Sequence, residues 1–588
     1  MSKIKVMDEI LANKIAAGEV VEKTMNVVKE LVENSIDANS TEISISLIDS
    51  GVKEITVSDN GIGMDREDAQ TAFSRHATSK LKKLDDLFNI DSLGFRGEAL
   101  PSIASVSNVR LKTSNGVEGT IVTLEGGKNI NVEPSDLQLG TTITVSDLFY
   151  NTPVRLKYLK NLYIELANIV EYVNKMALSY PNIKFTLSNN DKVLLSTDGN
   201  GDLLKVIYQI YGVEITKKMI PISGENDDYY LSGYISYPEA TKSNRNSITT
   251  LVNGRVIKNN ELNKLIVECY HTYIPKDKYP IIVLNIDVDP ILIDINIHPT
   301  KMDIKFSKMD TLKELVEKLI TERLKELTLI PNISVRDNSS VSEVRTQIKE
   351  EITEEKKEIQ NKQYETIQLD FTIQEEKKEY DELPFEVEEE KEEYRIKEMI
   401  PRGIVYLTYI FDENEDGMYV IDQHAAAERI NYEKYLHEMS TTKVNITDLL
   451  VPIKVELPTN EYLIIKENIP MLKEFGFDLD EFGTNTFIIR SHPTWLPSGY
   501  EEQAIKKILD IVSVNEEFSR EKFIEKAAIT MACRMSIKAN DYISYDDQVW
   551  LLDALRKTKN PFTCPHGRPT IITYTKYDLE KLFKRSID

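Results

Sequence analysis

The sequence predicts a multidomain α+β protein rather than a single fold. Its 588 residues exceed one domain, because domains usually span about 100–200 residues. Helical and strand-like patterns are interspersed without a regular strand–helix–strand alternation. The net charge of −24 is also uneven, since residues 331–400 carry 11 basic and 21 acidic side chains. A segment this charged cannot bury enough apolar surface to offset its ordering entropy.

This uneven charge predicts a flexible acidic linker over residues 333–398. The linker separates two less acidic parts of the chain, which we expect to be folded.

The N-terminal half begins with a helical pattern and continues mainly as strands. Apolar residues from Ile15 to Val32 recur on one helical face. Glu42–Ile48 alternates as a strand and Glu54–Ser58 follows as a second. Further strands are expected at Ile121, Thr142–Val145, Phe185–Leu187, Ile248–Val252, Val283–Val288 and Leu292–Ile297, and a helix at Leu312–Leu327.

The C-terminal part repeats this mixture. Its expected strands are Ile404–Phe411 and Gly417–Ile421, and its expected helices are Ala426–Leu436 and Ser519–Ile529. Because each half contains both strands and helices, the pattern favours α+β domains.

Composition excludes several classes of protein. Three cysteines are too few for a disulfide framework. The first ten residues lack the apolar core of a signal peptide. No apolar run reaches the roughly 18 residues that span a bilayer. These features predict a cytoplasmic protein without a membrane partner, and the acidic charge predicts weak, salt-sensitive DNA binding.

A nucleotide site is predicted near the N-terminus although no Walker-type phosphate loop occurs. Glu30 and Asn34 are four residues apart on one helical face, where a carboxylate could activate water and an amide oxygen could bind Mg²⁺. Asp59 ends a strand and could accept a hydrogen bond from an exocyclic amine. Glycines after Asp59, and Gly94 and Gly97 before an apolar helix, would let a ligand approach the backbone.

Several ordered motifs in this half resemble those of one protein family. The residues are Ile15–Val21, Lys29–Ala38, Asp59–Met64, His76–Lys80, Gly94–Leu100, Leu148–Arg155, Val252–Arg255 and Asn296–Lys301. Together they resemble the MutL family of DNA mismatch repair proteins, which belongs to the GHKL ATPases. The resemblance implies a Bergerat-type ATPase sandwich over residues 1–205 and an α/β transducer domain over 206–332. It also implies a C-terminal domain over 399–588, in which a smaller lobe over 455–525 is inserted.

The same resemblance implies roles for single residues in binding and hydrolysing ATP with Mg²⁺. Glu30 would be the general base, Asn34 the Mg²⁺ ligand and Asp59 the acceptor for the adenine amine. Lys301 would reach the γ-phosphate from the second domain. The remaining residues implied to contact the nucleotide are Gly61, Gly63, Thr78, Ser79, Lys80, Gly94, Phe95, Arg96, Gly97, Glu98 and Thr141.

A metal site is predicted in the C-terminal part. His424 and Glu428 are four residues apart on a helix start, and Cys564 and His566 share one side of an extended loop. With Asp422 they form a mixed donor set that suits Zn²⁺ and also admits Mn²⁺. Two adjacent ions would suit phosphodiester cleavage, whereas one ion would suit a structural zinc.

The motif from Asp422 to Glu433, Ala532-Cys533-Arg534, Cys564–Pro569 and Phe583–Arg585 resembles the nicking-endonuclease branch of the MutL family. This resemblance implies that Asp422 and Glu428 serve DNA cleavage and that Cys533 lies near the metals, although a buried structural thiol is an equal alternative for Cys533. The principal alternative function is a non-nuclease matchmaker with a structural zinc. A GHKL chaperone or a type II topoisomerase subunit is more distant.

The resemblance also implies partners: a second copy of the chain, DNA, the mismatch-recognition protein MutS, and the sliding clamp of the replicative polymerase. A clamp-binding segment is expected at Leu449, Leu450, Val451 and Pro452, where Thr447 replaces the usual leading glutamine. An edge strand is the alternative. During repair the protein would be associated with the nucleoid.

Overall fold

The structure is a computed structural model and describes most of the chain. The described residues are 20–80, 92–94, 97–157, 161–275, 278–294, 304–326, 395–440, 444–514, 519–537 and 541–584. Most of the expected linker, residues 333–394, lies outside them, as do Phe95, Arg96 and Lys301.

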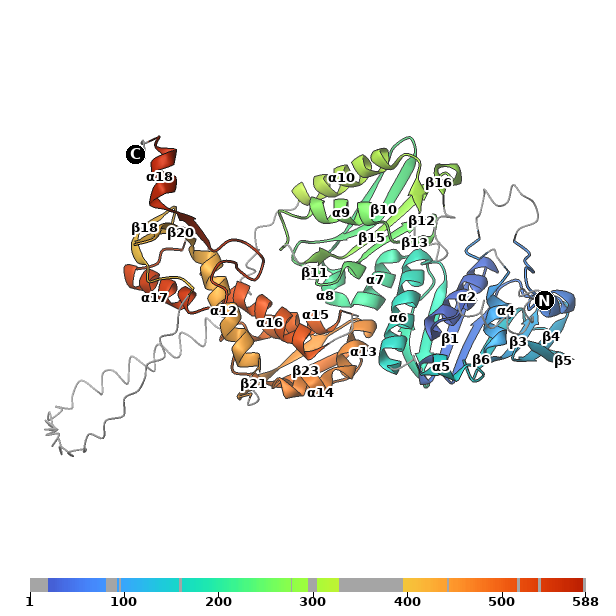
Figure 1. The fold of residues 1–588 in the computed structure, drawn as a ribbon. Helices are drawn as coiled ribbons and strands as arrows, with labels where there is room; N and C mark the ends of the chain where they lie inside the picture. The colour runs from blue at the N-terminus through green and yellow to red at the C-terminus, as the bar shows by residue number, and fades with distance from the viewer. Residues whose placement is uncertain are drawn as a thin grey trace, which may run out of the picture. The chain divides into compact units, whose positions relative to one another are not determined.

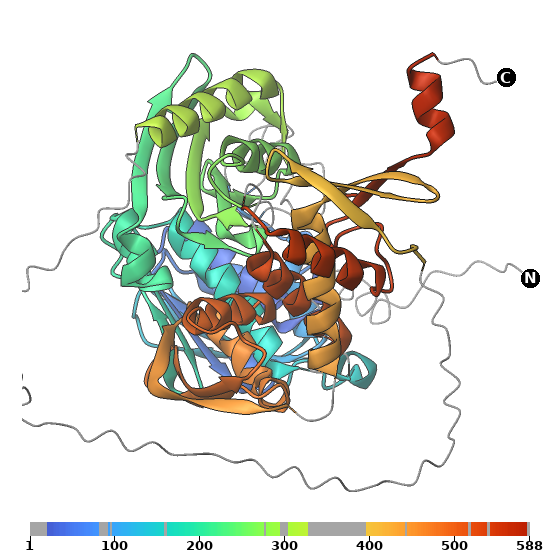
Figure 2. The ribbon, with the colours of Figure 1, turned by 90° about the vertical axis from the view of Figure 1, so that its left-hand side faces the viewer.

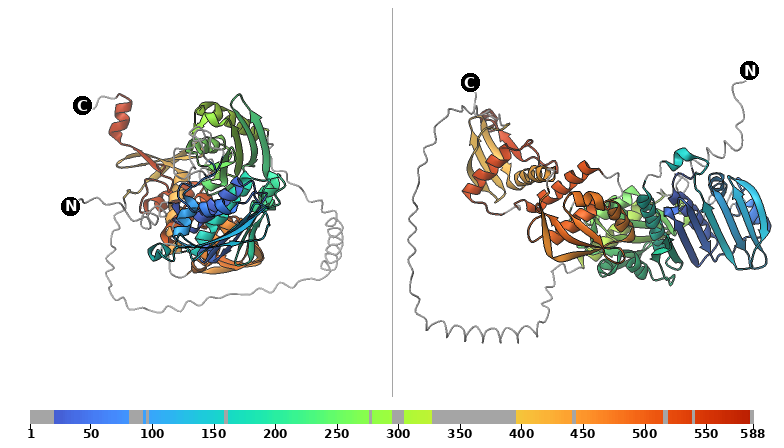
Figure 3. Two further views of the ribbon diagram at one scale, coloured as in Figure 1. Left: turned by 90° about the vertical axis from the view of Figure 1, so that its right-hand side faces the viewer. Right: turned by 90° about the horizontal axis from the view of Figure 1, so that it is seen from below.

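The N-terminal region is built on one eight-stranded sheet (Figures 1 and 3). Along the sheet the strands are β5 (Lys128–Pro134), β4 (Gly119–Glu125), β3 (Asn108–Ser114), β6 (Gly140–Ser146), β2 (Glu54–Asp59), β1 (Glu42–Ile48), β7 (Lys184–Asn189) and β8 (Lys192–Ser196). Strands β1 and β7 are parallel, and the other neighbours are antiparallel. The alternation in Glu42–Ile48 therefore correctly predicted a half-buried strand.

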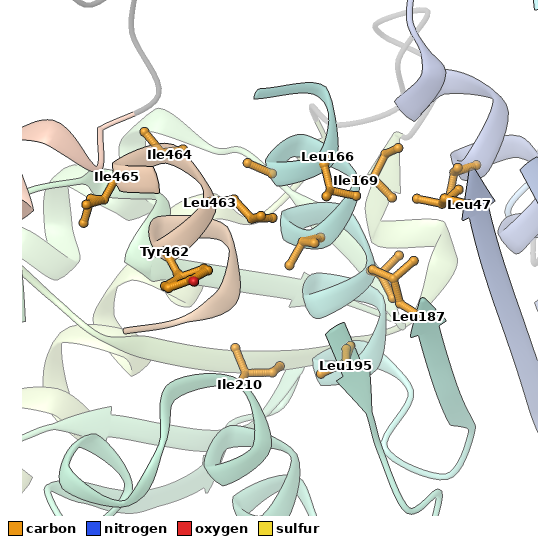
Figure 4. Packing of buried hydrophobic residues seen from close by; sticks show 14 of the residues in the cluster. Leu47, Leu166, Ile169, Leu187, Leu195, Ile210, Tyr462, Leu463, Ile464 and Ile465 are labelled. Atoms are coloured by element: carbon orange, nitrogen blue, oxygen red, sulfur yellow. The ribbon is translucent and has the colours of Figure 1, made fainter. Parts of the chain in front are cut away.

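Helices pack on this sheet through its apolar face. They are α2 (Thr24–Asp37), α3 (Arg66–Thr71), α4 (Ala99–Ser105), α6 (Leu162–Ser179) and α7 (Leu203–Tyr211). The short helix α5 (Pro153–Leu156) has no buried residue. Figure 4 shows Leu166 and Ile169 of α6 near Leu47 of β1 and Leu187 of β7, all within one buried cluster. This core fixes α2 against the sheet, which places Glu30 and Asn34 near the end of β2.

The second region contains a five-stranded sheet. Its strands, in spatial order, are β13 (Arg255–Ile257), β12 (Ile248–Val252), β15 (Ile282–Val288), β10 (Tyr229–Ser236) and β9 (Met219–Glu225). Helices α8 (Val213–Thr216), α9 (Asn260–Cys269) and α10 (Met309–Lys325) accompany it, and α10 runs along the sheet (Figure 2). Two short pairs complete the region: β11 (Thr241–Lys242) with β14 (Tyr279–Pro280), and β16 (Ile293–Asp294) with β17 (Lys305–Phe306). Of the strand expected at Leu292–Ile297, the described part is confined to β16.

The C-terminal region contains a four-stranded sheet in the order β18 (Ile400–Val405), β19 (Tyr409–Asn414), β20 (Gly417–Asp422) and β24 (Ile571–Tyr574). Helices α12 (Gln423–Ser440) and α17 (Tyr545–Arg556) share its buried core, and α18 (Lys576–Leu582) follows the last strand. The prediction of one strand over Ile404–Phe411 is wrong. Tyr406 and Leu407 have positive φ angles of 54° and 49°, so the chain turns there and continues as a hairpin.

A three-stranded antiparallel sheet forms a further lobe of this region. Its order is β21 (Ile446–Glu456), β23 (Thr486–Pro493) and β22 (Asp478–Glu481). The accompanying helices are α13 (Thr459–Glu467), α14 (Ile469–Glu474), α15 (Glu501–Val512) and α16 (Arg520–Met535). Tyr462 of α13 stacks on Phe487 of β23 with ring centroids 4.6 Å apart. Within the described part of the chain, no helix is long and apolar enough to cross a bilayer.

Candidate nucleotide and metal sites

Helix α2 and the end of β2 bring the first candidate site together. Asp59, the last residue of β2, accepts hydrogen bonds from the Ser35 hydroxyl of α2 at 2.8 Å and from the Gly61 amide at 2.9 Å. Thr141 lies beside it on the neighbouring strand β6. Because the carboxylate of Asp59 is held from two elements, its position is fixed before any ligand is considered.

Burial dominates the electrostatics of Asp59. It raises the pKa of this carboxyl above its usual value, while the hydrogen bonds from Gly61 and Ser35 act in the opposite direction. A partly buried carboxylate of this kind is suited to accept a hydrogen bond from a neutral donor of a ligand, such as an exocyclic amine.

The glycines after Asp59 are required by close backbone contacts. A Cβ on Gly63, whose φ is +66°, would lie 1.9 Å from the Ser114 carbonyl oxygen. A Cβ on Gly61 would lie 2.7 Å from the Ala38 carbonyl oxygen. Any side chain at either position would push this loop away from α2 and β3.

Lys80 connects the loop after α3 to the polar face of α2. Its ammonium donates to the Asn34 amide oxygen at 3.0 Å and to Asp37 Oδ2 at 2.5 Å. The Thr78 hydroxyl accepts from the Lys80 amide at 3.2 Å. Of the expected contact residues Thr78, Ser79 and Lys80, Lys80 therefore contacts the helix that carries Glu30 and Asn34.

The other side of this site is only partly described. Gly94 lies beside Lys80 and Asn34, since a Cβ on Gly94 would meet their polar atoms at 3.4 and 3.6 Å. Gly97 has φ of +61°, and its carbonyl accepts from the His76 amide at 3.1 Å. Glu98 follows Gly97 directly before α4. The predicted contacts Phe95, Arg96 and Lys301 lie outside the described residues.

The second candidate site combines α12 with a loop near the C-terminus. Ligand-type atoms of Glu428, Cys564 and His566 all lie within 4.8 Å of one another. His566 Nδ1 is 3.1 Å from Glu428 Oε2, and His424 Nε2 is 3.3 Å from Glu428 Oε1. Three of the predicted metal ligands, His424, Cys564 and His566, therefore converge on the carboxylate of a fourth, Glu428. Carboxylate, thiol and imidazole form a donor set that fits Zn²⁺ and also admits Mn²⁺.

The charge at the centre of this cluster is strongly stabilised. Burial by itself would raise the pKa of Glu428, but hydrogen bonds from His424 and His566 outweigh it and lower the pKa to about 2. The Glu428 hydrogen bond in turn raises the pKa of His424. Glu428 is only 2% exposed. Its carboxylate is therefore a buried anion, and the side chains around it are of types that can bind a metal cation.

Two acidic residues of the same motif have further contacts of their own. Asp422 Oδ1 accepts from the amides of His424 and Ala425 at 2.9 and 3.1 Å, which caps the start of α12. Glu433 accepts from the amides of Lys559 and Asn560 at 2.7 and 3.2 Å. Glu433 thus holds the segment that leads to Cys564, and Asp422 orients the helix that carries Glu428.

The loop that carries Cys564 is a tight turn. Cys564 donates its amide to the Arg568 carbonyl and Gly567 donates to the Cys564 carbonyl, both at 2.9 Å. Arg429 of α12 holds the Thr563 carbonyl at 2.6 Å. These contacts bring the Cys564 thiol, which is 2% exposed, to Glu428.

The two other cysteines differ. Cys533 is exposed rather than buried, and the nearby Glu428 raises the pKa of its thiol in addition to the larger effect of desolvation. The prediction that it lies near the metal ligands therefore agrees with the structure. Cys269 is half-buried in the second region, and desolvation raises its pKa to about 11.

The expected clamp-binding segment projects from β21. Pairing with β23 is interrupted between Asp448 and Ile453. Leu450 and Val451 are 103% and 78% exposed, while Leu449 packs against the core. The segment is part of a strand, as the alternative interpretation expected, and it also presents two apolar side chains to solvent.

Some site residues were missed at the level of sequence. Ser35 fixes Asp59, Asp37 binds Lys80, and Glu433 holds the cysteine-bearing segment. The spacing of Asp37 and Glu433 on their helices was visible, but nothing in it identified the distant partner of either carboxylate.

Matches to family models give the class of the protein. Residues 22–142 match the histidine kinase-, DNA gyrase B- and HSP90-like ATPase family, the region that contains Asp59 and α2. Residues 207–325 match the C-terminal domain of DNA mismatch repair proteins, and residues 402–543 match the MutL C-terminal dimerisation domain. The fold and sites thus define a GHKL-type ATPase joined to a dimerisation domain.

Full-length relatives identify the family. The chain is 48% identical over 594 residues to the DNA mismatch repair protein MutL of Listeria welshimeri, with 98% of each chain covered. It is 46% identical to MutL of Anoxybacillus flavithermus, with 100% of each covered. The chain therefore belongs to the MutL family of DNA mismatch repair proteins, as its motifs predicted.

Two solved structures each cover about half of this chain. An Aquifex aeolicus MutL ATPase domain complexed with ADP is 25% identical, with 51% of this chain and 98% of that chain covered and a TM-score of 0.36. The N-terminal domain of a DNA repair protein is also 25% identical, with 53% and 98% covered and a TM-score of 0.47.

Proposed function

We propose that this MutL-family protein binds and hydrolyses ATP at its N-terminal site and nicks DNA at its C-terminal metal site to direct strand-specific repair. The observation that carries the nuclease proposal is the convergence of His424, Cys564 and His566 on the buried carboxylate of Glu428. A matchmaker that only recruits other proteins would not need these metal-ligand side chains beside the exposed thiol of Cys533 and the end of β20.

The proposed ligands are Asp422, His424, Glu428, Cys564 and His566. Bound Zn²⁺ or Mn²⁺ would supply a Lewis acid for phosphodiester hydrolysis. The chain itself provides the orientation: the backbone carbonyl of Ile537 lies 2.7 Å from His424 Nδ1, which directs Nε2 towards Glu428. Such outer contacts set the tautomer and direction of a ligating imidazole.

Nicking of closed-circular DNA in the presence of Mn²⁺ tests this proposal. Wild-type protein is expected to nick, and Asp422→Asn is expected to lose the activity while Asn still caps α12. Cys269→Ser, which alters a thiol in the second region, is the matched control. A protein that binds zinc tightly but never nicks would instead support the matchmaker with a structural zinc.

In the N-terminal site we propose that Glu30 is the general base, Asn34 the Mg²⁺ ligand and Asp59 the adenine acceptor. Mg²⁺ would supply charge neutralisation for the phosphates. The proposal is supported by the fixed carboxylate of Asp59, which lies at the end of a strand beside two glycines that no other residue could replace.

Steady-state ATP hydrolysis tests these roles. Glu30→Ala is expected to lower turnover by at least about 100-fold, because general-base catalysis contributes about 10²–10⁴. Glu42→Ala, which removes an exposed ion pair with Lys184 on the same sheet, should keep wild-type turnover. Normal hydrolysis by Glu30→Ala would remove the assigned base.

For partners, the match to the dimerisation domain supports a homodimer, and membership of the family implies DNA. We further propose binding to MutS and to the polymerase sliding clamp. The clamp proposal is supported by the projecting Leu450 and Val451. Replacing both by alanine should abolish clamp-stimulated nicking, whereas Ile446→Ala, also exposed on β21, should not. Unchanged stimulation in the double variant would reject this segment.

A further inference from the structure

One carboxylate in the N-terminal site joins two segments that are distant in sequence. Asp37, the last residue of α2, has a side chain that is 7% exposed. Its Oδ1 accepts from the Leu93 amide at 2.8 Å, and its Oδ2 accepts from the Gly94 amide at 3.0 Å. The same Oδ2 accepts from the Lys80 ammonium at 2.5 Å. Asp37 therefore holds residues on both sides of the interval between Lys80 and Leu93.

The second region contacts the same place. Arg255, the first residue of β13, is 6% exposed and donates from Nη2 to the Ser92 carbonyl at 2.6 Å. Ser92 directly precedes the two amides that Asp37 binds. A buried arginine fixed in this way is a connection between the two regions rather than a free cation available to DNA.

The turn that carries Arg255 is itself held in place. Asn253 and Gly254 have φ angles of 46° and 78°, which is the geometry of a tight two-residue hairpin. The Gly254 carbonyl accepts from the Ser179 hydroxyl at the end of α6. A Cβ on Gly254 would lie 3.0 Å from the Tyr180 hydroxyl. The position of Arg255 therefore depends on the contact between the hairpin and α6.

We propose that Asp37 and Arg255 are positioning residues that jointly set nucleotide affinity, and that they couple the second region to the nucleotide site. This inference rests on the proposed ATP site. Asp37 orients Lys80, whose ammonium also lies 3.0 Å from the expected Mg²⁺ ligand Asn34. Arg255 holds the backbone beside Gly94, so movement of the β12–β13 hairpin changes the same wall of the site.

The hydrogen bonds of Asp37 and of Arg255 hold adjacent backbone residues. The effects of removing them are therefore expected to be non-additive. Charge-assisted hydrogen bonds, which a buried carboxylate accepts or a buried guanidinium donates, are stronger than neutral ones. Replacing Asp37 or Arg255 removes the partner of backbone groups in residues 92–94. This stretch of backbone is then held less firmly. Once one of these side chains has been replaced, the other holds backbone that is already displaced. Its replacement therefore lowers nucleotide affinity by a smaller factor.

Binding of a non-hydrolysable ATP analogue, together with KM and kcat for ATP, tests the proposal. Asp37→Asn and Arg255→Ala are each expected to raise the dissociation constant and KM about 10-fold, with kcat changed less than about 2-fold. The double variant should lose clearly less than the product of the two single losses. A merely structural defect would instead lower the active fraction, and so kcat, without raising KM.

Matched controls remove ion pairs elsewhere in the same two regions. Asp136→Asn breaks a pair with Lys112 at 2.6 Å, and Lys313→Ala breaks a pair with Glu261 at 2.6 Å. Both should keep wild-type affinity. Arg255→Lys replaces Arg255→Ala if the latter does not fold, and it should also weaken binding because an ammonium lacks the planar fork.

Two results would overturn the inference: wild-type affinity in both single variants, or a double variant whose loss equals the product. Failure of the underlying function would look different, because the wild-type protein would then bind no nucleotide at all.

Discussion

The two ends of the chain build their sites in contrasting ways. At the N-terminal end, Glu30, Asn34 and Asp37 share one helix and Asp59 ends the strand beside it. At the C-terminal end, Glu428 lies on α12, and its partner His566 follows 138 residues later in a loop. The first site depends mainly on regular elements, and the second depends on how a distant loop is held.

This difference indicates where each site is vulnerable. The core under α2 fixes the spacing of its polar face, so single polar substitutions there should change binding without moving the helix. The Cys564 loop is held by Arg429 and Glu433 through backbone contacts, so the metal site depends on residues that contact no metal.

The largest expected effect that separates the two ends is on metal affinity. Cys564→Ser should weaken Zn²⁺ binding by more than about 100-fold, because even outer contacts of a metal site are worth about 10–100-fold. ATP turnover should stay unchanged. Metal content after dialysis, compared with Cys269→Ser, provides the measurement. Full zinc occupancy in Cys564→Ser would exclude this thiol as a ligand.

A somewhat smaller effect is expected at the nucleotide end. Asp59→Asn should weaken binding of an ATP analogue by about 10–100-fold, because a hydrogen bond to a charged group is worth about 1.5–3 kcal/mol. Metal content should remain at the wild-type level. Calorimetric titration would measure the affinity, and an unchanged dissociation constant would mean that Asp59 does not contact the base.

Two buried carboxylates of the C-terminal region, Glu428 and Asp412, differ in their hydrogen-bond partners. Glu428 has several partners, whereas Asp412 of β19 is 1% exposed and its two oxygens have no hydrogen-bond partner among the described residues. Burial raises the pKa of Asp412 to about 7. Its carboxyl is therefore protonated in the folded protein at pH values where the unfolded chain is already ionised.

The smallest expected effect is on stability and follows from this shift. Between about pH 4 and 7 the folded state binds the extra proton, so the free energy of unfolding should fall as pH rises. Asp412→Asn should remove this dependence and stabilise the C-terminal region by on the order of 2 kcal/mol at pH 8, with little change at pH 4. Chemical denaturation at both pH values is the measurement. Equal stability of the two proteins at pH 8 would contradict the assignment.

Local patterns predicted much of the fold and the juxtaposition of His424 and Glu428 on one helix. The alternation in Glu42–Ile48 and the helical face around Val27 and Leu31 were sufficient because their periods differ and each buries one side. The expected strand Ile404–Phe411 failed because an apolar run does not reveal a turn at Tyr406 and Leu407. No glycine or proline marks that turn.

Long-range contacts explain what the sequence could not predict. Asp37 and Glu433 lie in motifs that the sequence identifies, yet the motifs do not reveal that each carboxylate accepts backbone amides from a distant segment. Arg255 also lies in a motif, and the sequence does not show that it is buried against Ser92. Such partners depend on how the elements pack, which no local spacing encodes.

We propose that the cluster around Glu428 is a nuclease centre in a chain that also binds ATP. The initial rate at which closed-circular DNA is converted to the nicked form with Mn²⁺, for wild type and Glu428→Gln, tests this proposal. Wild type is expected to nick, and Glu428→Gln is expected to lose at least about 100-fold of the rate with ATP turnover intact. Equal nicking by the two proteins would rule out Glu428 as part of a nuclease centre.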